Sequence, residues 1–590
     1  MYKPGKFQLM FLRWRKRQRD SRVTPLVLSA LVGVTVGLAA ILIKTIISYV
    51  EEYAIRFFPG ILYFIIPMIG LVLVVFLNRN IFYKTVNFRG TSHVMEAIKN
   101  NGAIINFRLM YSKFITTGLS IGFGGSSGVE AAIITTGSAI GSNTGQFLGL
   151  GYKQRTLMIG CGIAGGISAV YNAPVGGFLF ALETVLPAFT PTLLIPLLIS
   201  AVFGKVLFEV FMGDQLRFEA PIPDFTYDQL PFVLALGIAG MLAARFLHKT
   251  YRFCYRYLSR IKNDYLRAVT GGLILGTVIF LFPPMYGEGY ISINALLRAN
   301  ESEVFSNSIF SNIPHTHVTD LVFFFLLTLA KPLSTGLSVN SGGEGGYFAP
   351  SIITGGFLGY FFYKVIFLYA PGADMVVSPV TYIYLGMAAT FACVMNAPVT
   401  AIFLIADITQ SYELFVPLMF VCATSYFLKY TTESKGSKSG IRKTDRGLLQ
   451  TEGMVLNNVS AYELVERNVA DVRPDDTLRK LSELSATTNR DVIPVNSEEG
   501  RFEGIVKLND IRKRLYDAAQ YDSVLVRDLC QAPEETVSLQ ESASSVLEKF
   551  DRVNSWYLPV VQDDRFIGFV SRMKVLARYR TELNKGNRFF

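Results

Sequence analysis

Apolar residues recur in long runs between residues 25 and 430, and short polar or glycine-rich segments separate these runs. Several runs are shorter than the roughly 20 residues that a helix needs to cross a bilayer. Short, glycine-interrupted helices occur at membrane depth only where protein buries them or a cavity adjoins them. The pattern therefore predicts a large bundle with tilted or re-entrant helices, at Pro25–Val50, Ile61–Leu77, Met110–Ile121, Glu130–Leu148, Leu157–Val170, Ala173–Leu186, Thr192–Phe211, Phe232–Leu247, Ala268–Leu281, Val318–Leu337, Phe348–Leu368, Val380–Val394, Val399–Ile408 and Leu414–Tyr430.

The apolar region contains an internal repeat. The segment EAAIITTGSAIG at Glu130–Gly141 is similar to FAPSIITGGFLG at Phe348–Gly359, at an offset of 348 − 130 = 218. Asn172–Val175 recurs as Asn396–Val399 at an offset of 396 − 172 = 224, and each copy precedes an apolar run that ends in one carboxylate. Repeated halves in membrane transporters form a site at their interface, built from broken helices near the midplane. The repeat therefore indicates a transport pathway.

Glu130 lies between a glycine-rich loop and the small residues of the helix that follows. An ionisable residue in such apolar surroundings is energetically costly and is a functional candidate by default. The backbone amides that open a helix form a ready-made anion site. We expect the Glu130 carboxylate to occupy that site when no other anion does. A loop carboxylate that faces lipid headgroups is the structural alternative.

Composition and charge support a membrane protein. Of the 590 residues, 51% are hydrophobic and 17% are charged, which is too apolar for a soluble chain of this length. Part of the net charge of +11 lies in Met1–Arg22, directly before the first apolar run. By the positive-inside rule this end is cytoplasmic, and no soluble domain accompanies it that would favour a nucleic-acid site. The first apolar run is too long for the core of a cleavable signal peptide.

Cysteines and histidines give no sign of a metal site. The 5 cysteines are scattered without disulfide or metal-ligand spacing, so we interpret them as packing residues in a reducing or lipid setting. The polar stretch Asn300–His317 predicts an extramembrane loop, in which His315 and His317 are the candidate metal pair. Two lone histidines are more often solvated, because zinc sites usually have more protein ligands than this.

The composition changes after Tyr430. Residues 431–454 are polar and basic, which predicts a linker, and the chain from about residue 455 to 580 is typical of a soluble α/β protein. This region repeats as well: Asp491–Asp510 and Ser555–Lys574 each indicate strand, turn and strand, with helices on both sides. We expect two such units to bury their faces against each other.

The residues described above resemble the CLC family of chloride channels and proton-coupled chloride transporters, prokaryotic type, followed by a pair of CBS domains. The most specific segments are GVE at Gly128–Glu130, GYFAP at Gly346–Pro350 and NAP at Asn172–Pro174. The resemblance implies a polytopic α-helical membrane protein with two inverted structural repeats and a cytoplasmic α/β CBS-pair domain. The implied domains are a basic cytoplasmic N-terminus at 1–22, a membrane domain at 23–430 with halves of about 23–215 and 230–430, a linker at 431–454, and CBS domains at 455–518 and 519–590.

The resemblance also implies an assembly and a site. It implies a homodimer in the lipid bilayer of the cell (inner) membrane, with both termini cytoplasmic and one anion pathway per subunit. Glu130 matches the gating glutamate, whose carboxylate competes with anions for the pathway. The anion-binding positions that it implies, mainly through backbone amides, are Gly128, Val129, Ala131, Gly346, Tyr347, Phe348 and Ala349.

The chain departs from the family pattern at several positions. Around the gate, Val129, Ala131 and Ala132 stand where the family usually has a basic residue and a Gly-Pro pair. By the count back from Met95, the anion-coordinating serine is replaced by Arg89. Arg89 either binds the anion with its guanidinium or extends to lipid headgroups while a neighbouring hydroxyl binds instead. The central pathway tyrosine has no clear match, and Ser439 is the weak stand-in.

The proton-transfer glutamate of the transporters falls on Thr184, directly after Glu183. Because threonine does not titrate near neutral pH, we favour transport of chloride or a similar small anion by a channel or a weakly coupled conductor. A proton-coupled antiporter, with protons passing through water or Glu183, is the alternative. A non-transporting membrane sensor linked to the CBS pair is the second alternative. No nucleophile–base pair indicates an enzyme.

In the CBS pair, each copy keeps half of a nucleotide-binding pattern. The first copy has Asp510 but Lys507 in place of the hydroxyl residue, and the second has Ser571 but Lys574 in place of the aspartate. We therefore expect adenine nucleotide to bind weakly or not at all, and we expect no other cofactor. A structural or gating module without a nucleotide is the alternative reading of this pair.

Overall fold

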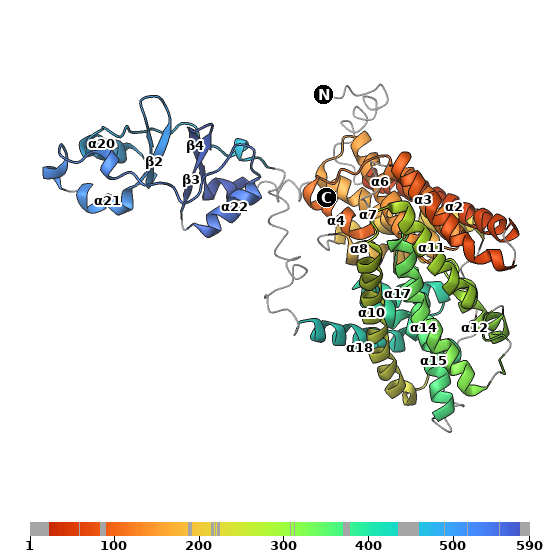
Figure 1. The fold of residues 1–590 in the computed structure, drawn as a ribbon. Helices are drawn as coiled ribbons and strands as arrows, with labels where there is room; N and C mark the ends of the chain where they lie inside the picture. The colour runs from red at the N-terminus through yellow and green to blue at the C-terminus, as the bar shows by residue number, and fades with distance from the viewer. Residues whose placement is uncertain are drawn as a thin grey trace. The chain divides into compact units, whose positions relative to one another are not determined.

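The structure is a computed structural model, and its chain forms two compact units, residues 1–440 and 441–590 (Figure 1). Each unit is described by itself. The residues that the structure describes are 23–57, 60–82, 90–186, 191–213, 218, 220, 225–306, 308–311, 313–314, 316–369, 378–434, 459–488, 490–515, 517–553 and 555–578.

The first unit is helical wherever an apolar run predicted a helix. Its elements are α2 Val23–Phe57, η1 Gly60–Ile65, α3 Ile66–Asn80, α4 Gly90–Asn100, α5 Leu109–Gly122, α6 Glu130–Phe147, α7 Tyr152–Tyr171, α8 Pro174–Thr184, α9 Pro191–Met212, η2 Tyr227–Gln229, α10 Leu230–Leu258, α11 Asp264–Leu281, η3 Pro283–Met285, α12 Tyr290–Leu297, α13 Glu301–Phe305, α14 His317–Asn340, α15 Phe348–Tyr369, α16 Pro379–Met395, α17 Pro398–Thr409 and α18 Phe415–Ser434. The apolar runs did not predict α4, α12 and α13, which are short. Helix α18 also continues beyond Tyr430, into the expected linker.

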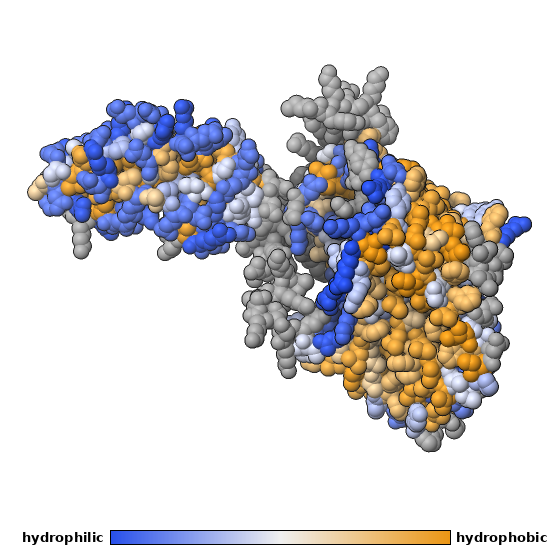
Figure 2. Space-filling view, viewed as in Figure 1, coloured by the Kyte–Doolittle hydropathy of each residue, from blue (hydrophilic) through white to orange (hydrophobic). Residues whose placement is uncertain are grey.

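The first unit has the surface of a membrane protein. Within the described residues, 7 helices are long and apolar enough to cross a bilayer. Large apolar side chains on them are exposed, such as Leu31 on α2 and Val210 on α9. Figure 2 shows a broad apolar surface over this unit. In water an apolar patch of this extent would be a binding or aggregation site, whereas lipid is its natural solvent. The chain is a multi-pass membrane protein.

The internal repeat is visible in how the helices cross. Helices α6 and α7 of the first half pack as α15 and α16 do in the second. A Cβ added at Gly137 would lie 2.3 Å from the carbonyl oxygen of Gly162, and one added at Gly355 would lie 2.3 Å from that of Gly386. Both crossings bring backbone against backbone, which only small residues permit. The repeat seen in the sequence is therefore a repeat of packing.

The two halves also cap each other's helices. The Glu183 carboxylate, at the end of α8, accepts hydrogen bonds from the amide (2.8 Å) and the hydroxyl (2.7 Å) of Thr400 in the first turn of α17. Asp407, near the end of α17, accepts bonds from the amides of Val175 (2.8 Å) and Gly176 (3.0 Å) in the first turn of α8. Carboxylates stabilise helix N-termini because they satisfy unpaired amides and oppose the helix dipole. Each of the two helices thus caps the N-terminus of the other with a carboxylate near its own C-terminus, as expected for two inverted copies.

The second unit has two similar halves. Its elements are η6 Ala461–Glu463, α20 Leu478–Thr487, β1 Val492–Asn496, β2 Phe502–Lys507, α21 Leu508–Leu515, η7 Ala518–Gln520, η8 Val526–Asp528, α22 Ala543–Arg552, β3 Tyr557–Gln562 and β4 Arg565–Ser571. Strand β1 pairs antiparallel with β2, and β3 pairs antiparallel with β4. The expected order of helix, strand, turn, strand and helix is confirmed in both copies, since residues 508–515 and 572–578 are helical after the second strands.

The two halves of this unit share a core, as the sequence predicted. Phe569 packs in one buried cluster with Val492 and Ile505 of the other half. The rings of Phe502 and Phe566 stack with centroids 5.5 Å apart. The short turns are also exchanged. Ala461 of η6 lies in the core of the second half, and Val526 of η8 lies in the core of the first. Each half is thus completed by residues that lie in the sequence beside the other half.

Candidate functional site

Two helix N-termini meet at the centre of the helical unit. Helix α6 begins at Glu130 and helix α15 at Phe348, the two aligned positions of the repeat. The loops before them are joined by an antiparallel bridge, in which Gly128 and Gly346 each donate an amide to the other's carbonyl at 3.0 Å. The first amides of a helix have no acceptor within it and carry partial positive charge. The bridge therefore brings two anion-attracting poles together.

Glycine is required at this meeting point. A Cβ added at Gly128 would lie 1.9 Å from the Oε2 atom of Glu130 and 2.9 Å from the Cβ of Ala349. Gly345, in the facing loop, has a φ of +135°, which residues with a side chain rarely adopt. A side chain at either position would push the loops apart. The glycine-rich segments of the sequence thus allow the close approach.

The Glu130 side chain is fully buried at this junction. Its Oε1 atom accepts a hydrogen bond from the Tyr171 hydroxyl, which in turn accepts one from the Tyr290 hydroxyl at 2.9 Å. Among the described residues, no partner lies within hydrogen-bonding distance of Oε2. A buried carboxylate oxygen without a partner is costly. One oxygen is therefore held, and the other is open to a proton or to movement of the side chain.

Aromatic rings pack beside Tyr171, the residue that donates to the carboxylate. The Phe348 ring stacks on Tyr171 with centroids 5.2 Å apart. It also meets Phe180 edge-on at 5.3 Å and Phe391 at 4.5 Å. These rings come from α15, α7, α8 and α16, so both halves of the repeat contribute. Rings of this kind exclude water, and electrostatic interactions are strong where water is excluded.

A buried ion pair fixes the loop before α15. The Lys113 ammonium on α5 lies 2.8 Å from the Oε1 atom of Glu344, and both side chains are almost completely buried. Asn78 donates to the same oxygen at 3.0 Å. The Ser127 hydroxyl donates to the Glu344 carbonyl at 3.1 Å, which ties the two glycine-rich loops together. Removing one partner of such a pair is strongly destabilising, so the loop has little freedom to move.

The comparison with known sequence families shows to which protein family the chain belongs. The family described as "Voltage gated chloride channel" matches residues 69–430, which is more than half of the chain. The chain belongs to this family. The family described as "CBS domain" matches residues 461–517 and 526–580. The expected family and the expected pair of CBS domains are thus confirmed.

Relatives and solved structures agree with this family. A "Putative chloride channel protein ClcB-like" of Ralstonia nicotianae (strain ATCC BAA-1114 / GMI1000) is 30% identical over 358 residues, covering 59% of this chain and 78% of that protein. An "H(+)/Cl(-) exchange transporter ClcA" of Vibrio vulnificus (strain YJ016) is 26% identical over 416 residues, covering 67% of this chain and 84% of that protein.

Two solved structures show the same fold. A eukaryotic CLC transporter has a TM-score of 0.57 at 18% identity and covers 93% of this chain and 97% of its own. A slow cyanobacterial Cl⁻/H⁺ antiporter has a TM-score of 0.58 at 20% identity and covers 70% of this chain and 95% of its own. The expected fold, inverted membrane repeats followed by a CBS pair, is confirmed.

The structure brings most of the predicted anion-site residues of the family together. Gly128, Val129, Glu130 and Ala131 lie at the start of α6, and Gly346, Tyr347, Phe348 and Ala349 lie at the start of α15. The Tyr347 ring packs against His248 and Tyr251, with centroids 5.9 Å and 5.8 Å away. Arg89 and Ser439 lie outside the described residues, so their predicted roles stay predictions.

The two residues of the predicted proton pathway make structural hydrogen bonds. The Thr184 hydroxyl donates to the Phe180 carbonyl at 2.6 Å, within its own helix. Glu183 caps α17, as described above. To transfer a proton, either side chain would have to give up these hydrogen bonds.

Sequence reasoning missed Tyr171 and Tyr290, whose hydroxyls lead to Glu130. Ser439 was named as the stand-in for the central pathway tyrosine, and no donor to Glu130 was named, whereas in the structure Tyr171 donates to Glu130. A signal was present. Tyr171 directly precedes Asn172 of the repeated motif, and Met395 stands at the matching position of the second half. A tyrosine at only one of two repeated apolar helix ends indicates that its hydroxyl has a specific hydrogen-bond partner.

The CBS ligand candidates are largely engaged within the protein. The Ser571 hydroxyl donates to the Oε1 atom of Glu466 at 2.9 Å, and the Lys574 amide donates to the Ser571 hydroxyl at 3.3 Å. Lys507 lies 3.0 Å from the Glu534 carboxylate. Asp510 is exposed. These contacts do not gather the four residues into one ligand site.

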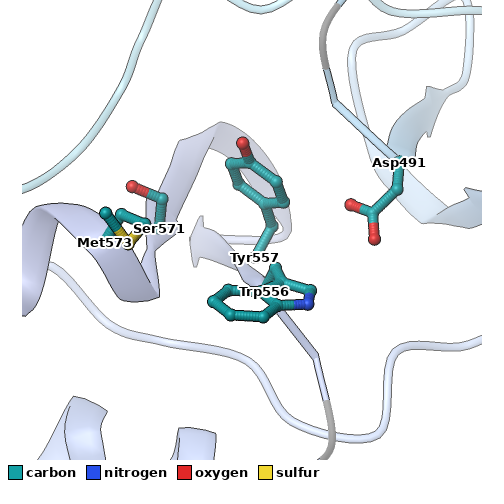
Figure 3. A pocket seen from close by; sticks show the side chains of 5 residues that line it. All are labelled: Asp491, Trp556, Tyr557, Ser571 and Met573. Atoms are coloured by element: carbon teal, nitrogen blue, oxygen red, sulfur yellow. The ribbon is translucent and has the colours of Figure 1, made fainter.

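A cavity of about 230 Å³ lies at the second strand pair and is lined by Asp491, Trp556, Tyr557, Ser571 and Met573 (Figure 3). Figure 3 shows the two rings between the Asp491 carboxylate on one side and Ser571 and Met573 on the other. Of the four predicted ligand residues, Ser571 lines this cavity. Because its hydroxyl already donates to Glu466, it is not free to donate to a phosphate.

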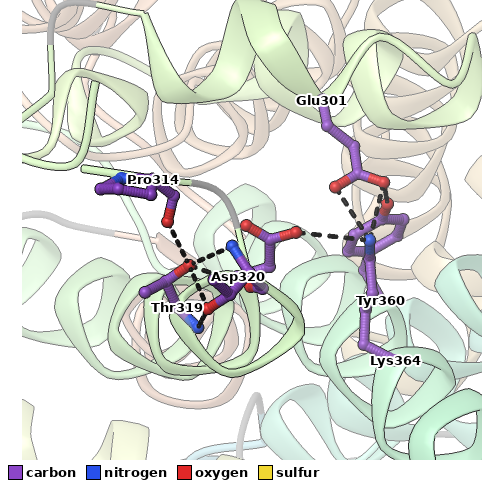
Figure 4. Close-up of polar contacts among 7 residues, drawn as sticks. Glu301, Pro314, Thr319, Asp320, Tyr360 and Lys364 are labelled. Atoms are coloured by element: carbon purple, nitrogen blue, oxygen red, sulfur yellow. Dashed lines mark hydrogen bonds and ion pairs between the residues drawn. The ribbon is translucent and has the colours of Figure 1, made fainter. Parts of the chain in front are cut away.

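The expected loop Asn300–His317 is not a plain loop. It contains helix α13, and Glu301 of that helix lies 2.8 Å from the Lys364 ammonium on α15 (Figure 4). Asp320 on α14 lies 3.9 Å from the same ammonium, and Tyr360 donates to Glu301. This cluster fastens α13 to α14 and α15. His315 lies outside the described residues, and His317 is the first residue of α14.

Proposed function

We propose that the protein transports chloride, or a similar small monovalent anion, along a path gated by Glu130. One observation carries the proposal: a fully buried carboxylate stands where two helix N-termini meet. Helix N-termini bind anions through free amides and the helix dipole. An ionised Glu130 would compete with a passing anion for these amides, and a protonated Glu130 would not. The relatives named as chloride channels and as chloride exchangers support this anion.

For the coupling mode, we place the channel or weakly coupled conductor first. Thr184, at the position of the proton-transfer residue, has no titrating group and donates its hydroxyl to its own helix. Glu183, the nearest carboxylate in sequence, is held by three donors at the start of α17. A proton route through either residue would break these contacts.

The proton-coupled antiporter is the second candidate, and a specific observation favours it. The Tyr290 and Tyr171 hydroxyls form a continuous chain that ends on Glu130. A chain of hydroxyls of this kind can pass a proton to the carboxylate at its end. The relative from Vibrio vulnificus is named an H⁺/Cl⁻ exchange transporter. The non-transporting sensor stays the third alternative, and the costly unpaired carboxylate argues against it.

The assembly and location follow the family expectation. We propose a homodimer in the cell (inner) membrane, with the N-terminus and the CBS pair in the cytoplasm. The basic segment Met1–Arg22 supports this orientation, although it lies outside the described residues. We also propose that the CBS pair works without bound adenine nucleotide, because Ser571 and Lys507 are both engaged within the protein. Transport, rather than catalysis, is the proposed activity.

One experiment separates the three candidates. The full chain is reconstituted in liposomes under a chloride gradient, and chloride efflux and external pH are recorded together. Chloride efflux with no uphill proton movement is the result expected of a weakly coupled conductor. Proton uptake against its gradient, driven by chloride, would promote the antiporter. Chloride efflux equal to that of protein-free liposomes would favour the non-transporting sensor.

A further inference from the structure

A second carboxylate reaches the N-terminus of α6. Glu288 lies in the loop between η3 and α12, and 10% of its side chain is exposed. Its Oε1 atom accepts a hydrogen bond from the Val129 amide at 3.4 Å. Its Oε2 atom lies 2.5 Å from the Lys44 ammonium on α2. Glu288 therefore joins the start of α6 to a buried cation.

The amide that Glu288 accepts from is part of the proposed pathway. Val129 directly precedes Glu130 and is the residue before the first turn of α6. An anion that passes this helix end would bind the same group of amides. A side-chain carboxylate at that position is chemically equivalent to a bound anion. The first amide of the site is thus already taken by the protein itself.

The backbone around Glu288 directs its carboxylate. Gly287 and Gly289 flank it with φ angles of +55° and +96°, conformations in which glycine is favoured. The fully buried Lys331 ammonium on α14 donates to the Gly287 carbonyl at 2.9 Å. A Cβ at Gly289 would lie 3.2 Å from that ammonium. In this loop conformation, which the bond from Lys331 helps to hold, the Glu288 side chain reaches the start of α6.

The charges that face Glu288 come from every neighbouring element. Helix α2 contributes Lys44 and Glu51, α6 contributes Glu130, and α14 contributes Lys331. Glu130 and Glu288 are close enough to repel each other electrostatically. Two carboxylates at one helix end are stable only with a cation nearby, and Lys44 supplies it. Displacing one carboxylate therefore alters the balance for the other.

Resting on the proposed anion transport, we propose that Glu288 is a second gating carboxylate in this pathway, held by Lys44. An anion that reaches α6 displaces Glu288 from the Val129 amide as well as Glu130 from the space beside Tyr171. Glu288 then sets the anion affinity of the Val129 amide, while Glu130 closes the path. The free side chain remains paired with Lys44 when it withdraws, so no lone charge is left in an apolar region.

The test compares Glu288→Gln with Glu51→Gln in reconstituted full-length protein. Both variants remove one negative charge from the same cluster, but Glu51 lies on α2 and acts on Glu288 and Lys44 only through its charge. Glu288→Gln keeps an oxygen that can accept from Val129 but loses the charge, and it is expected to raise chloride flux about tenfold because a charge-assisted hydrogen bond becomes a neutral one. Glu51→Gln is expected to leave flux within about twofold of the wild type, as exposed or indirect charge changes do. An equal rise in both variants, or no rise in Glu288→Gln, would overturn the proposal.

A third variant keeps the test decisive if Glu288→Gln folds poorly. Glu288→Asp retains the charge and the pairing with Lys44 but shortens the side chain by one methylene. If contact with the Val129 amide matters, Glu288→Asp also raises flux; flux at the wild-type level would overturn the proposal. A wild-type protein that moves no anion at all would instead refute the proposed function, so the two failures are distinguishable.

Discussion

Replacing Tyr171 by phenylalanine is expected to loosen the gate while leaving the fold intact. The substitution removes only the hydroxyl that donates to Glu130. The ring stays, and with it the stacking on Phe348 at 5.2 Å. A volume-conserving change of this kind in a packed core is usually tolerated. The variant therefore tests the two hydrogen bonds of this hydroxyl, to Glu130 and from Tyr290, rather than the packing around them.

The size of the effect follows from the surroundings of Glu130. The carboxylate is fully buried, and among the described residues its other oxygen has no partner. A hydrogen bond to a charged group contributes about 1.5 to 3 kcal/mol. Losing this bond lowers the population of the conformation in which Glu130 lies beside Tyr171 by about 10- to 150-fold, because each 1.4 kcal/mol is a factor of about ten. Anion flux at fixed pH is expected to rise in the same direction, until another step limits it.

The assay is chloride efflux from liposomes, measured for the wild type, Tyr171→Phe and the matched control Tyr290→Phe. The Tyr290 hydroxyl donates to Tyr171 and not to Glu130. The control therefore removes the hydrogen bond to Tyr171 and keeps the bond from Tyr171 to Glu130, so it is expected to raise chloride flux less than Tyr171→Phe does. Thermal unfolding in detergent checks that all three proteins are equally stable.

Either of two results would contradict this reasoning. If Tyr171→Phe leaves flux unchanged while Glu130→Gln raises it, the hydroxyl does not hold the gate. If Tyr290→Phe raises flux as much as Tyr171→Phe does, the hydroxyl chain as a whole, and not the direct bond, sets the closed state.

Three further predictions concern stability. Gly137→Ala places a Cβ 2.3 Å from the Gly162 carbonyl and should lower stability by about 1–3 kcal/mol. Gly151→Ala faces open space and changes only the N-cap of α7, so it should lower stability less. Thermal unfolding in detergent compares the two variants, and equal stabilities would contradict the close helix crossing. Asp407→Ala removes the acceptor of two α8 amides and should cost about 0.5–2 kcal/mol in the same assay. Burial alone would raise the pKa of Glu466, but hydrogen bonds from an arginine and a serine outweigh it and hold the pKa below the usual 4.5. Its stabilisation is therefore present above that pH and is lost as pH falls through the lower folded value, so acid unfolding of the CBS pair should depend less on pH in Glu466→Gln; an unchanged pH profile would contradict this.

The fold could be predicted from the sequence because it depends on repeated motifs and on short-range hydrophobic patterns. The offset of 218 between Glu130–Gly141 and Phe348–Gly359 is matched by helix crossings with the same geometry. Apolar runs located the long helices because burial and lipid both select apolar residues. Helices α12 and α13 were missed because they have only 8 and 5 residues, and helices this short depend on tertiary contacts for their stability.

The site was predicted only where a motif names its residues. Glu130 was identified because a carboxylate in an apolar helix start is rare. Tyr171, Tyr290 and Glu288 were not, because they come from helix ends and loops that are far from Glu130 in sequence. Their proximity depends on how α7, α12 and the Gly287–Gly289 loop pack, which no local pattern encodes. Two sequence signals existed, namely the tyrosine before Asn172 and the glycines around Glu288.

The central claim is that Glu130 is an ionisable gate in an anion path. The most direct measurement is chloride flux through wild-type and Glu130→Gln protein in liposomes, over a range of external pH. Glutamine has the shape of a protonated glutamate, so it does not compete with an anion as a carboxylate does. We predict that the variant conducts faster than the wild type and that its flux depends less on external pH. A variant with the rate and the pH dependence of the wild type would contradict the account.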